Sequence, residues 1–213
     1  MLTFAIGDIH GCADHLEAML AKIDKFHQGR EHRIITLGDY IDRGPDSKRV
    51  LDILMDRPDI IKLRGNHEEM LLSSLDGDLL TLRMFLGNGG YETLNSFSAD
   101  APEQVDPKYI RFLHEMKVSF ETERHFYCHA GVKPGVPLSE QKEQDLLWIR
   151  DEFLRHKGPF EKYIVHGHTP DDRMRIGPYR TNVDSGCVFT GTLSCAVIED
   201  GTDLPLDEIT VSI

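Results

Sequence analysis

The sequence predicts an α/β protein in which two mixed β-sheets pack face to face as a sandwich and helices flank them. In the first third of the chain, three apolar strands alternate with two segments of helical periodicity, a pattern typical of a parallel sheet with crossover helices. In the last third, short strands are separated by Gly, Pro and Asp turns, which favours antiparallel pairing. The chain has no internal repeat, low-complexity tract or linker, so we expect residues 1–213 to form one domain.

The first three strands are apolar, and a glycine follows each of them closely: residues 1–6, 33–37 and 60–63. Residues 14–26 carry apolar side chains at helical spacing, which buries one face of that helix. A second helix begins at Asp46 and ends before Pro58. Parallel α/β sheets bind ligands in the loops after the carboxyl ends of their strands, so we expect the site in the loops after these strands.

Residues 67–116 have a mainly helical and polar pattern that is broken at Asn88-Gly89-Gly90. Helices are expected at residues 69–75, 79–86, 91–97 and 108–116, with a loop at 98–107. We expect this block to cover one end of the sheet. Two interpretations stay open for most of it: it shapes the substrate cleft, or it is scaffold without substrate contact.

The second half of the chain is predicted to begin with paired strands and to continue through one helix into short strands. The expected strands are residues 118–121, 124–128, 163–165, 174–176, 179–183, 193–198 and 206–211, with the helix at 141–156. The sequence thus supplies enough strands for a second sheet.

Composition excludes several classes of function. The net charge of −12 argues against a basic nucleic-acid-binding face, and it would repel a phosphate group unless cations reverse the local potential. No apolar run approaches the ~20 residues that cross a bilayer, and the N-terminus lacks the basic region of a signal peptide. The four cysteines form no CxxC pair, so we expect reduced, mostly buried thiols in a cytoplasmic protein.

Polar side chains with metal-binding capacity follow the ends of the predicted strands. They comprise three oxygen donors and three imidazoles: Asp8, His10, Asp39, Asn66, His129 and His168. This set suits divalent ions such as Mn²⁺, Fe²⁺ or Zn²⁺ rather than a structural cysteine–zinc site. A carboxylate shared by two ions holds them ~3.5–4 Å apart, as phosphoryl transfer requires. Each residue alone could be a turn, capping or core residue, but five such loops make that explanation improbable for all of them.

Five short blocks carry a resemblance to a known family. They are GDIHG at 7–11, GDYIDRG at 38–44, RGNHE at 64–68, HAG at 129–131 and HGHTP at 166–170. These blocks resemble the signature of the calcineurin-like metallophosphoesterases, and most closely that of the PPP-type serine/threonine phosphatases of bacteria and phage. The resemblance runs from Leu2 to about Val188 and extends to the segments Asn88-Gly89-Gly90 and Leu147–Asp151. It implies the calcineurin-like metallophosphoesterase fold.

The resemblance also implies a role for each matched residue. Asp8 and His10 would bind the first ion, Asp39 would bridge, and the second ion would be held by Asn66, His129 and His168. His67 would be the general acid that protonates the leaving alkoxide, with a hydroxide between the two ions as nucleophile. Asp42 would fix the tautomer of His67. The substrate phosphate would be bound by Arg43, Arg150, Arg64 and Asn66.

The resemblance implies a dinuclear, Mn²⁺-dependent phosphatase of phosphoserine and phosphothreonine in proteins or peptides, with phosphotyrosine as a further substrate. The alternative is a symmetrical diadenosine-tetraphosphate hydrolase or another small-molecule phosphoesterase. Asp42-Arg43 favours the first, because an alcohol leaving group needs a proton. A catalytically dead scaffold would require the loss of a ligand or of the acid, and none is missing. No nucleic acid or membrane partner is expected.

Several neighbouring residues are expected to have supporting roles. His166 shares a strand face with His168 and is expected to lie behind the ligands. Tyr40 and Trp148 are expected to pack near the site, and Asp184-Ser185-Gly186 is expected to be a structural turn. For Cys12 and Cys128, burial is expected rather than redox sensing. The chain is much shorter than eukaryotic PPP catalytic domains, so no regulatory subunit is inferred.

Overall fold

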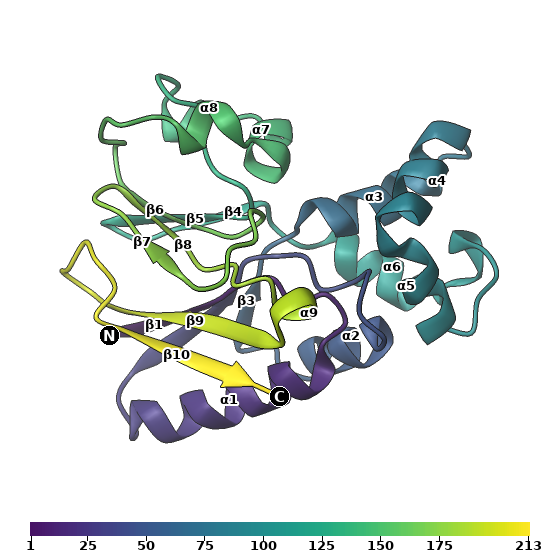
Figure 1. Cartoon of the computed structure of the whole chain (residues 1–213), viewed down its shortest axis with the longest axis horizontal. Helices are drawn as coiled ribbons and strands as arrows, with labels where there is room; N and C mark the ends of the chain where they lie inside the picture. Colours follow the sequence, from purple (N-terminus) through teal and green to yellow (C-terminus); the bar gives the residue numbers. More distant parts are fainter.

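Two five-stranded mixed sheets stack on each other, and helices cover their outer faces (Figure 1). The structure is a computed structural model, and it describes all residues, 1–213. The strand order is β10-β9-β1-β2-β3 in the first sheet and β4-β5-β6-β8-β7 in the second. The predicted sandwich of two mixed sheets with flanking helices is therefore confirmed.

The first sheet contains the three strands expected near the N-terminus. These are β1 (Leu2–Ile6), β2 (His32–Thr36) and β3 (Ile60–Lys62), and they run parallel. Two strands from the end of the chain, β9 (Thr192–Glu199) and β10 (Asp207–Ser212), extend this sheet in antiparallel fashion beyond β1. Helices α1 (Ala13–His27) and α2 (Ser47–Met55) lie along its outer face (Figure 1).

The second sheet combines parallel and antiparallel pairs. An antiparallel pair, β4 (Ser119–Glu121) and β5 (His125–Cys128), is followed by β6 (Tyr163–His166), which runs parallel to β5. Strand β8 (Arg180–Asn182) is parallel to β6, and β7 (Arg175–Ile176) is antiparallel to β8.

The expectation of a wholly antiparallel last third is therefore wrong. Short strands between turns indicate only that the chain reverses, and they do not say which strand each one joins. Strand β8 pairs with β6 in the second sheet, whereas β9 crosses to β1 in the first. The choice of partner is made by packing between segments distant in sequence, which no local pattern reports.

Four helices form a group at one end of the sandwich (Figure 1). They are α3 (Asn66–Ser74), α4 (Leu79–Phe85), α5 (Tyr91–Ser96) and α6 (Pro107–His114). A kinked turn at Leu86–Gly90, in which Asn88 and Gly89 leave the helical conformation, joins α4 to α5, and a short 3₁₀ turn at Pro102–Gln104 precedes α6. The expected helical block is thus present, and α3 begins within the RGNHE motif itself.

The single helix expected at residues 141–156 is divided into two. Helix α7 (Glu143–Trp148) ends before Ile149, whose ψ of 140° is extended. Helix α8 (Asp151–Leu154) begins after Arg150, which has φ −131° and ψ −95°. Arg150 therefore lies between the two helices and belongs to neither. Helix α9 (Cys187–Thr190) was not expected, and the left-handed glycines Gly186 and Gly191 bound it. A four-residue helix is too short to show helical periodicity in sequence.

The hydrophobic core has three parts, and alternation along the strands separates them. In β1, Phe4 and Ile6 face α1 within a cluster of 31 buried residues, whereas Ala5 belongs to an 11-residue cluster between the two sheets. A third cluster, which includes Phe126 and Phe153, packs α7 and α8 on the outer face of the second sheet. No helix is both long and apolar enough to cross a membrane.

Candidate metal centre

The motif loops follow strands β1, β2, β3, β5 and β6, which run parallel within their sheets, so the carboxyl ends of each set meet at one edge. The two sheets face each other, and this brings both sets of loops to the same end of the sandwich (Figure 1). The parallel pairing of β5 with β6 is therefore what places His129 beside His168.

Two glycines let the loops approach closely. Gly38 has a φ of +104°, and a Cβ there would lie 2.6 Å from the Cα of Gly65 and 2.9 Å from Nδ1 of His129. A side chain at Gly65 would likewise collide with Asp39. Glycine at both positions allows the loop after β2 to lie directly on the loop after β3.

The backbone of the site is strained. Seven residues other than glycine have positive φ, and five of them belong to the predicted site: His10, Asp39, Asp42, Arg43 and His168. The left-handed region is unfavourable for such residues, and it persists only where the surrounding structure imposes it. These strained conformations lower the stability of the fold, and they fix the orientation of the five side chains.

The first group of potential ligands contains His10, Asp39 and His67, whose ligand atoms lie within 4.8 Å of one another. Nε2 of His10 is 3.4 Å from Oδ2 of Asp39, and Nε2 of His67 is 3.8 Å from the same oxygen. Nδ1 of His10 lies 2.8 Å from the carbonyl oxygen of Ile41 and donates to it, which orients the ring. Burial lowers the pKa of His10 to about 3, so the imidazole is neutral and able to bind a cation.

The second group contains Asp39, His129 and His168, again with ligand atoms within 4.8 Å. Nε2 of His129 is 3.3 Å from Oδ1 of Asp39, 2.8 Å from Oδ1 of Asn66 and 3.1 Å from Nδ1 of His168. Oδ1 of Asn66 is also 2.8 Å from Nδ1 of His168. Asp39 thus belongs to both groups, with one oxygen directed to each.

The chemistry of these donors fits a cation. Nδ1 of His129 lies 2.9 Å from the carbonyl oxygen of Leu37, which can only accept, so Nδ1 carries the proton and Nε2 presents a lone pair. That lone pair faces Oδ1 of Asn66 and Oδ1 of Asp39, which are both acceptors. Converging lone pairs in a buried place repel one another unless a positive charge lies between them.

Electrostatics within the site support this interpretation. Burial alone would raise the pKa of Asp39, but the imidazoles of His129, His67 and His10 hold it well below its usual value. Burial also lowers the pKa of His168. Burial acts to lower the pKa of His129 as well, but the neighbouring Asp39 carboxylate raises it above its usual value. An ionised Asp39 beside the neutral imidazoles of His10 and His168 is the protonation state that divalent cations require.

Asp8 lies at the margin of these groups. Its two carboxylate oxygens accept from the backbone N–H of His168 at 3.2 and 3.0 Å. Burial and the neighbouring carboxylate of Asp184 raise the pKa of Asp8 well above its usual value, and burial raises that of Asp184 to about 6. Asp184 is thus part of the site's electrostatics as well as of a turn in which its Oδ1 accepts from the N–H of Gly186 at 2.8 Å.

His67 and Asp42 form a buried pair in which Nδ1 of His67 lies 2.6 Å from Oδ2 of Asp42. Burial lowers the pKa of His67 to about 4 and raises that of Asp42 well above its usual value. Sequence reasoning missed the third member, Thr93, whose hydroxyl donates to Oδ1 of Asp42 at 2.6 Å and accepts from the Asp42 N–H at 2.8 Å. Thr93 lies in α5, outside the five blocks and three residues after Asn88-Gly89-Gly90, so no motif residue pointed to it directly.

Glu68 is a second residue that sequence reasoning left without a role. Its carboxylate is fully buried and accepts from the N–H groups of Asp39 at 2.9 Å, Tyr40 at 2.8 Å and Gly65 at 2.8 Å. Burial raises its pKa to about 7. Glu68 therefore joins the loop after β2 to the loop after β3, and its position within RGNHE was the available signal.

The three arginines are placed differently. Nη1 of Arg43 donates to Nε2 of His10 at 2.8 Å, and Nη2 of Arg150 donates to the carbonyl oxygen of His168 at 3.2 Å. Burial is the main cause of the lowered pKa of His67, and Asp39 opposes it. The positive charges of Arg43 and Arg150 lower this pKa further, so both guanidinium groups lie near that imidazole. Arg64 instead contacts Glu143, and its Nε is 3.3 Å from Glu69.

The supporting residues occupy the surroundings of the site. His166 packs edge-on against Phe153 at 4.9 Å between ring centroids, and its Nδ1 lies 3.0 Å from the carbonyl oxygen of Gly167. Tyr40 is buried, and its hydroxyl lies 2.8 Å from that of Thr36. Trp148 packs edge-on near His168 at 6.4 Å.

The model of the calcineurin-like phosphoesterase family matches residues 1–196, which include every motif loop described above. The chain belongs to the calcineurin-like phosphoesterase family. This confirms the resemblance drawn from the five blocks, and it makes the chain a phosphoesterase of a family that uses divalent metals.

Relatives of this phosphoesterase carry two kinds of name. Serine/threonine-protein phosphatase 1 of Salmonella typhimurium is 31% identical over 204 residues, covering 92% of this chain and 91% of that protein. The asymmetrical bis(5'-nucleosyl)-tetraphosphatase PrpE of Geobacillus thermodenitrificans is 30% identical over 228 residues, covering 89% and 87%. A crystal structure of a protein assigned as a diadenosine tetraphosphatase superposes with a TM-score of 0.71 and 24% identity, covering 99% and 92%, which supports the fold.

Proposed function

We propose that this phosphoesterase is a dinuclear metal-dependent phosphomonoesterase that dephosphorylates serine and threonine residues of proteins or peptides. The observation that carries the proposal is the buried His67–Asp42 contact of 2.6 Å beside the two groups of ligands. A general acid held in place by a carboxylate is needed to expel a serine or threonine alkoxide, which is a very poor leaving group. Phosphotyrosine is a further substrate under this proposal.

In the proposed site, His10, Asp39 and Asp8 would hold one cation, and Asp39, Asn66, His129 and His168 would hold the other. Mn²⁺ is the proposed ion, and Fe²⁺ and Zn²⁺ suit the same oxygen and imidazole donors. When bound, the cations would supply positive charge to the phosphoryl oxygens and lower the pKa of a water molecule. The ligand roles are supported by the convergence of His129, Asn66 and His168 within 3.1 Å.

The chain's own groups complete the proposed reaction. The guanidinium groups of Arg43 and Arg150, together with the Asn66 amide, would bind and orient the phosphate oxygens. The negative phosphate would raise the pKa of His67 from its low value, because an opposite charge nearby favours the protonated ring. His67 would then donate the Nε2 proton to the departing alkoxide while Asp42 holds Nδ1. Arg64 would reach substrate only if it left Glu143 and Glu69.

A dinucleotide polyphosphate is the second candidate substrate, because a relative at 30% identity is named an asymmetrical bis(5'-nucleosyl)-tetraphosphatase. Our alternative from sequence was the symmetrical diadenosine-tetraphosphate hydrolase. A nucleotide phosphate leaves without a proton, so hydrolysis of such a substrate would not require His67. The presence of the complete His67–Asp42–Thr93 arrangement supports the phosphomonoester.

Steady-state kinetics with Mn²⁺ should separate the two candidates. We expect kcat/KM for phosphoserine and phosphothreonine peptides to exceed that for diadenosine tetraphosphate by at least about tenfold, a difference of ~1.4 kcal/mol in transition-state binding. A preference for the dinucleotide would overturn the phosphoprotein proposal and leave the metal-dependent phosphoesterase in place.

A further inference from the structure

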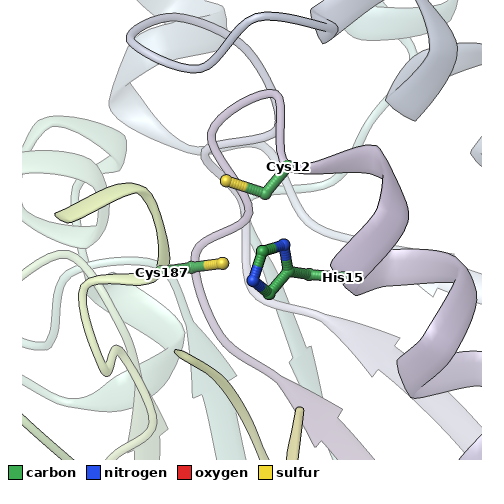
Figure 2. A group of neighbouring side chains, drawn as sticks. All are labelled: Cys12, His15 and Cys187. Carbon is green, nitrogen blue, oxygen red and sulfur yellow. The ribbon is translucent and has the colours of Figure 1, made fainter. Parts of the chain in front are cut away.

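A second group of metal-binding side chains lies outside the motif loops. The sulfur atoms of Cys12 and Cys187 and a ring nitrogen of His15 all lie within 4.8 Å of one another. Cys12 directly precedes α1, His15 is in the first turn of α1, and Cys187 is the first residue of α9 (Figure 2). The fold therefore assembles three ligands from segments that are about 175 residues apart in the sequence.

We propose that Cys12, His15 and Cys187 bind a thiophilic divalent cation, with Zn²⁺ as the ion that best suits two thiolates and one imidazole. Zn–S bonds of about 2.3 Å at tetrahedral angles place sulfur atoms ~3.8 Å apart. The three ligand atoms lie within 4.8 Å of one another, so binding requires a contraction of at most about 1 Å, within the reach of side-chain rotation. A site with three protein ligands leaves the fourth position to water.

The position of His15 supports a metal ligand. Its Nε2 lies 3.0 Å from the carbonyl oxygen of Gly191, and because a carbonyl only accepts, Nε2 carries the proton. Nδ1 is then left with a lone pair for a cation. Metal-binding histidines commonly donate their other N–H to a backbone carbonyl in this way, which fixes the tautomer and the ring orientation.

Gly191, which orients His15, is hydrogen-bonded to the third ligand, Cys187. Gly191 ends α9 in the left-handed conformation, and its N–H donates to the carbonyl oxygen of Cys187 at 2.8 Å. Helix α9 thus carries the Cys187 thiol, and the glycine that ends it, Gly191, accepts the hydrogen bond from His15. Cys187 is buried, whereas Cys12 and His15 are half-buried, so an ion can enter from their side.

This Cys12–His15–Cys187 site differs in chemistry from the proposed dinuclear centre. The dinuclear centre contains only oxygen and imidazole donors, which suit Mn²⁺, whereas thiolates select softer ions. A bound cation would connect α9 to the start of α1. The loop between β1 and α1 also carries Asp8 and His10, so binding would stabilise the segment that supplies two of the proposed ligands.

Cobalt titration of the full chain tests this proposal. Co²⁺ occupies zinc sites, and thiolate ligation produces charge-transfer absorption in the near ultraviolet that the dinuclear centre, which has no sulfur ligand, does not produce. The protein is kept reduced with a phosphine that does not bind metal through a thiol. We expect the absorption to appear at one Co²⁺ per chain in addition to the dinuclear centre, and to disappear when Zn²⁺ is added.

Three variants locate the signal. Cys187→Ser is expected to abolish the charge-transfer absorption or to weaken Co²⁺ affinity at this site at least tenfold. Cys195→Ala, which removes a buried thiol of β9 outside the cluster, is the matched control and should keep the signal. Should Cys187→Ser fail to fold, the half-buried His15→Gln replaces it, with the same expected loss of affinity.

Two results would overturn the proposal. One is the absence of charge-transfer absorption in protein whose thiols titrate as free. The other is absorption of unchanged strength in both Cys187→Ser and His15→Gln, which would place the bound cobalt elsewhere. Neither readout depends on phosphatase activity.

Discussion

At the scale of single residues, the site is built from side chains that are held in unfavourable states. Asp42 combines a positive φ of 71° with a fully buried carboxylate, which Thr93 and His67 satisfy through hydrogen bonds. Each unsatisfied buried polar group would cost about 1–3 kcal/mol, so these contacts are needed to keep Asp42 in place. The same arrangement orients Nε2 of His67 toward Asp39 and the proposed metal centre. The proposed transfer of the proton to the leaving alkoxide takes place there.

Replacement of His67 by asparagine tests its proposed role. We expect His67→Asn to lower kcat for a phosphoserine peptide by ~10²–10⁴-fold, because the alkoxide loses its proton donor. For p-nitrophenyl phosphate, whose leaving group hardly needs a proton, the loss should be much smaller. The measurement is kcat for both substrates at saturating Mn²⁺.

His166→Asn is the matched control for this experiment, because His166 is also a buried histidine but packs against Phe153 instead of pairing with Asp42. It should affect the two substrates equally. Equal losses on both substrates in His67→Asn would show that His67 does not act as the acid.

At the scale of elements, the kinked turn at Leu86–Gly90 supports the loop after β2. The carbonyl oxygen of Gly89 accepts from the N–H of Arg43 at 3.1 Å, and α5, which follows the turn, supplies Thr93 to Asp42. Gly89 has a φ of +103°. The sequence left open whether residues 67–116 are scaffold or shape the substrate cleft. The structure shows that this block contacts two residues of the site, Asp42 and Arg43, although it contributes no proposed metal ligand.

Substitution at Gly89 should disturb phosphate binding without removing any catalytic group. A Cβ there would lie 2.5 Å from the N atom of Arg43 and 2.8 Å from its Cγ, so Gly89→Ala must displace Arg43 or the turn. Displacement of the order of 1 Å can cost up to ~10²-fold in kcat/KM. We expect most of the loss to appear as a higher KM, measured with p-nitrophenyl phosphate.

Gly87→Ala is the control within the same turn, because no atom lies within 4 Å of a Cβ at that position. This variant should retain wild-type kinetics. If the two variants behaved alike, the turn would have no role in positioning Arg43.

At the scale of the whole molecule, the two sheets supply separate halves of the proposed centre. Asp8, His10, Asp39 and Asn66 follow strands of the first sheet, whereas His129 and His168 follow strands of the second. The net charge of −12 is unfavourable for a phosphate substrate, and cations in this position would counter it locally. Cations bound between the sheets would connect them in the folded state only.

Binding of Mn²⁺ should therefore raise the melting temperature. A ligand that binds only the folded state stabilises it by ~2.7 kcal/mol at a concentration 100 times its Kd. We expect exhaustive chelation to abolish activity and lower Tm, and excess Mn²⁺ to restore both. The measurements are calorimetry and the rate of p-nitrophenyl phosphate hydrolysis on the same samples.

Asp39→Asn should show little of this Mn²⁺-dependent stabilisation, because Asp39 faces both groups of ligands. Asp203→Asn changes an exposed carboxylate between β9 and β10 that pairs with Arg124, and it should respond to Mn²⁺ as the wild type does. Activity that persists after exhaustive chelation would rule out the metal mechanism.

The sequence by itself determined the family, the pairing of sheets with flanking helices, and the motif residues placed after strand ends. Those inferences rest on local signals: apolar periodicity, glycines at turns, and donors adjacent in the chain. Only the tertiary structure decided that β8 joins β6, that the chain breaks at Arg150, and that Thr93, Glu68 and Asp184 support the centre. Contacts between residues tens of positions apart depend on packing in three dimensions, and the group formed by Cys12, His15 and Cys187 exists for the same reason.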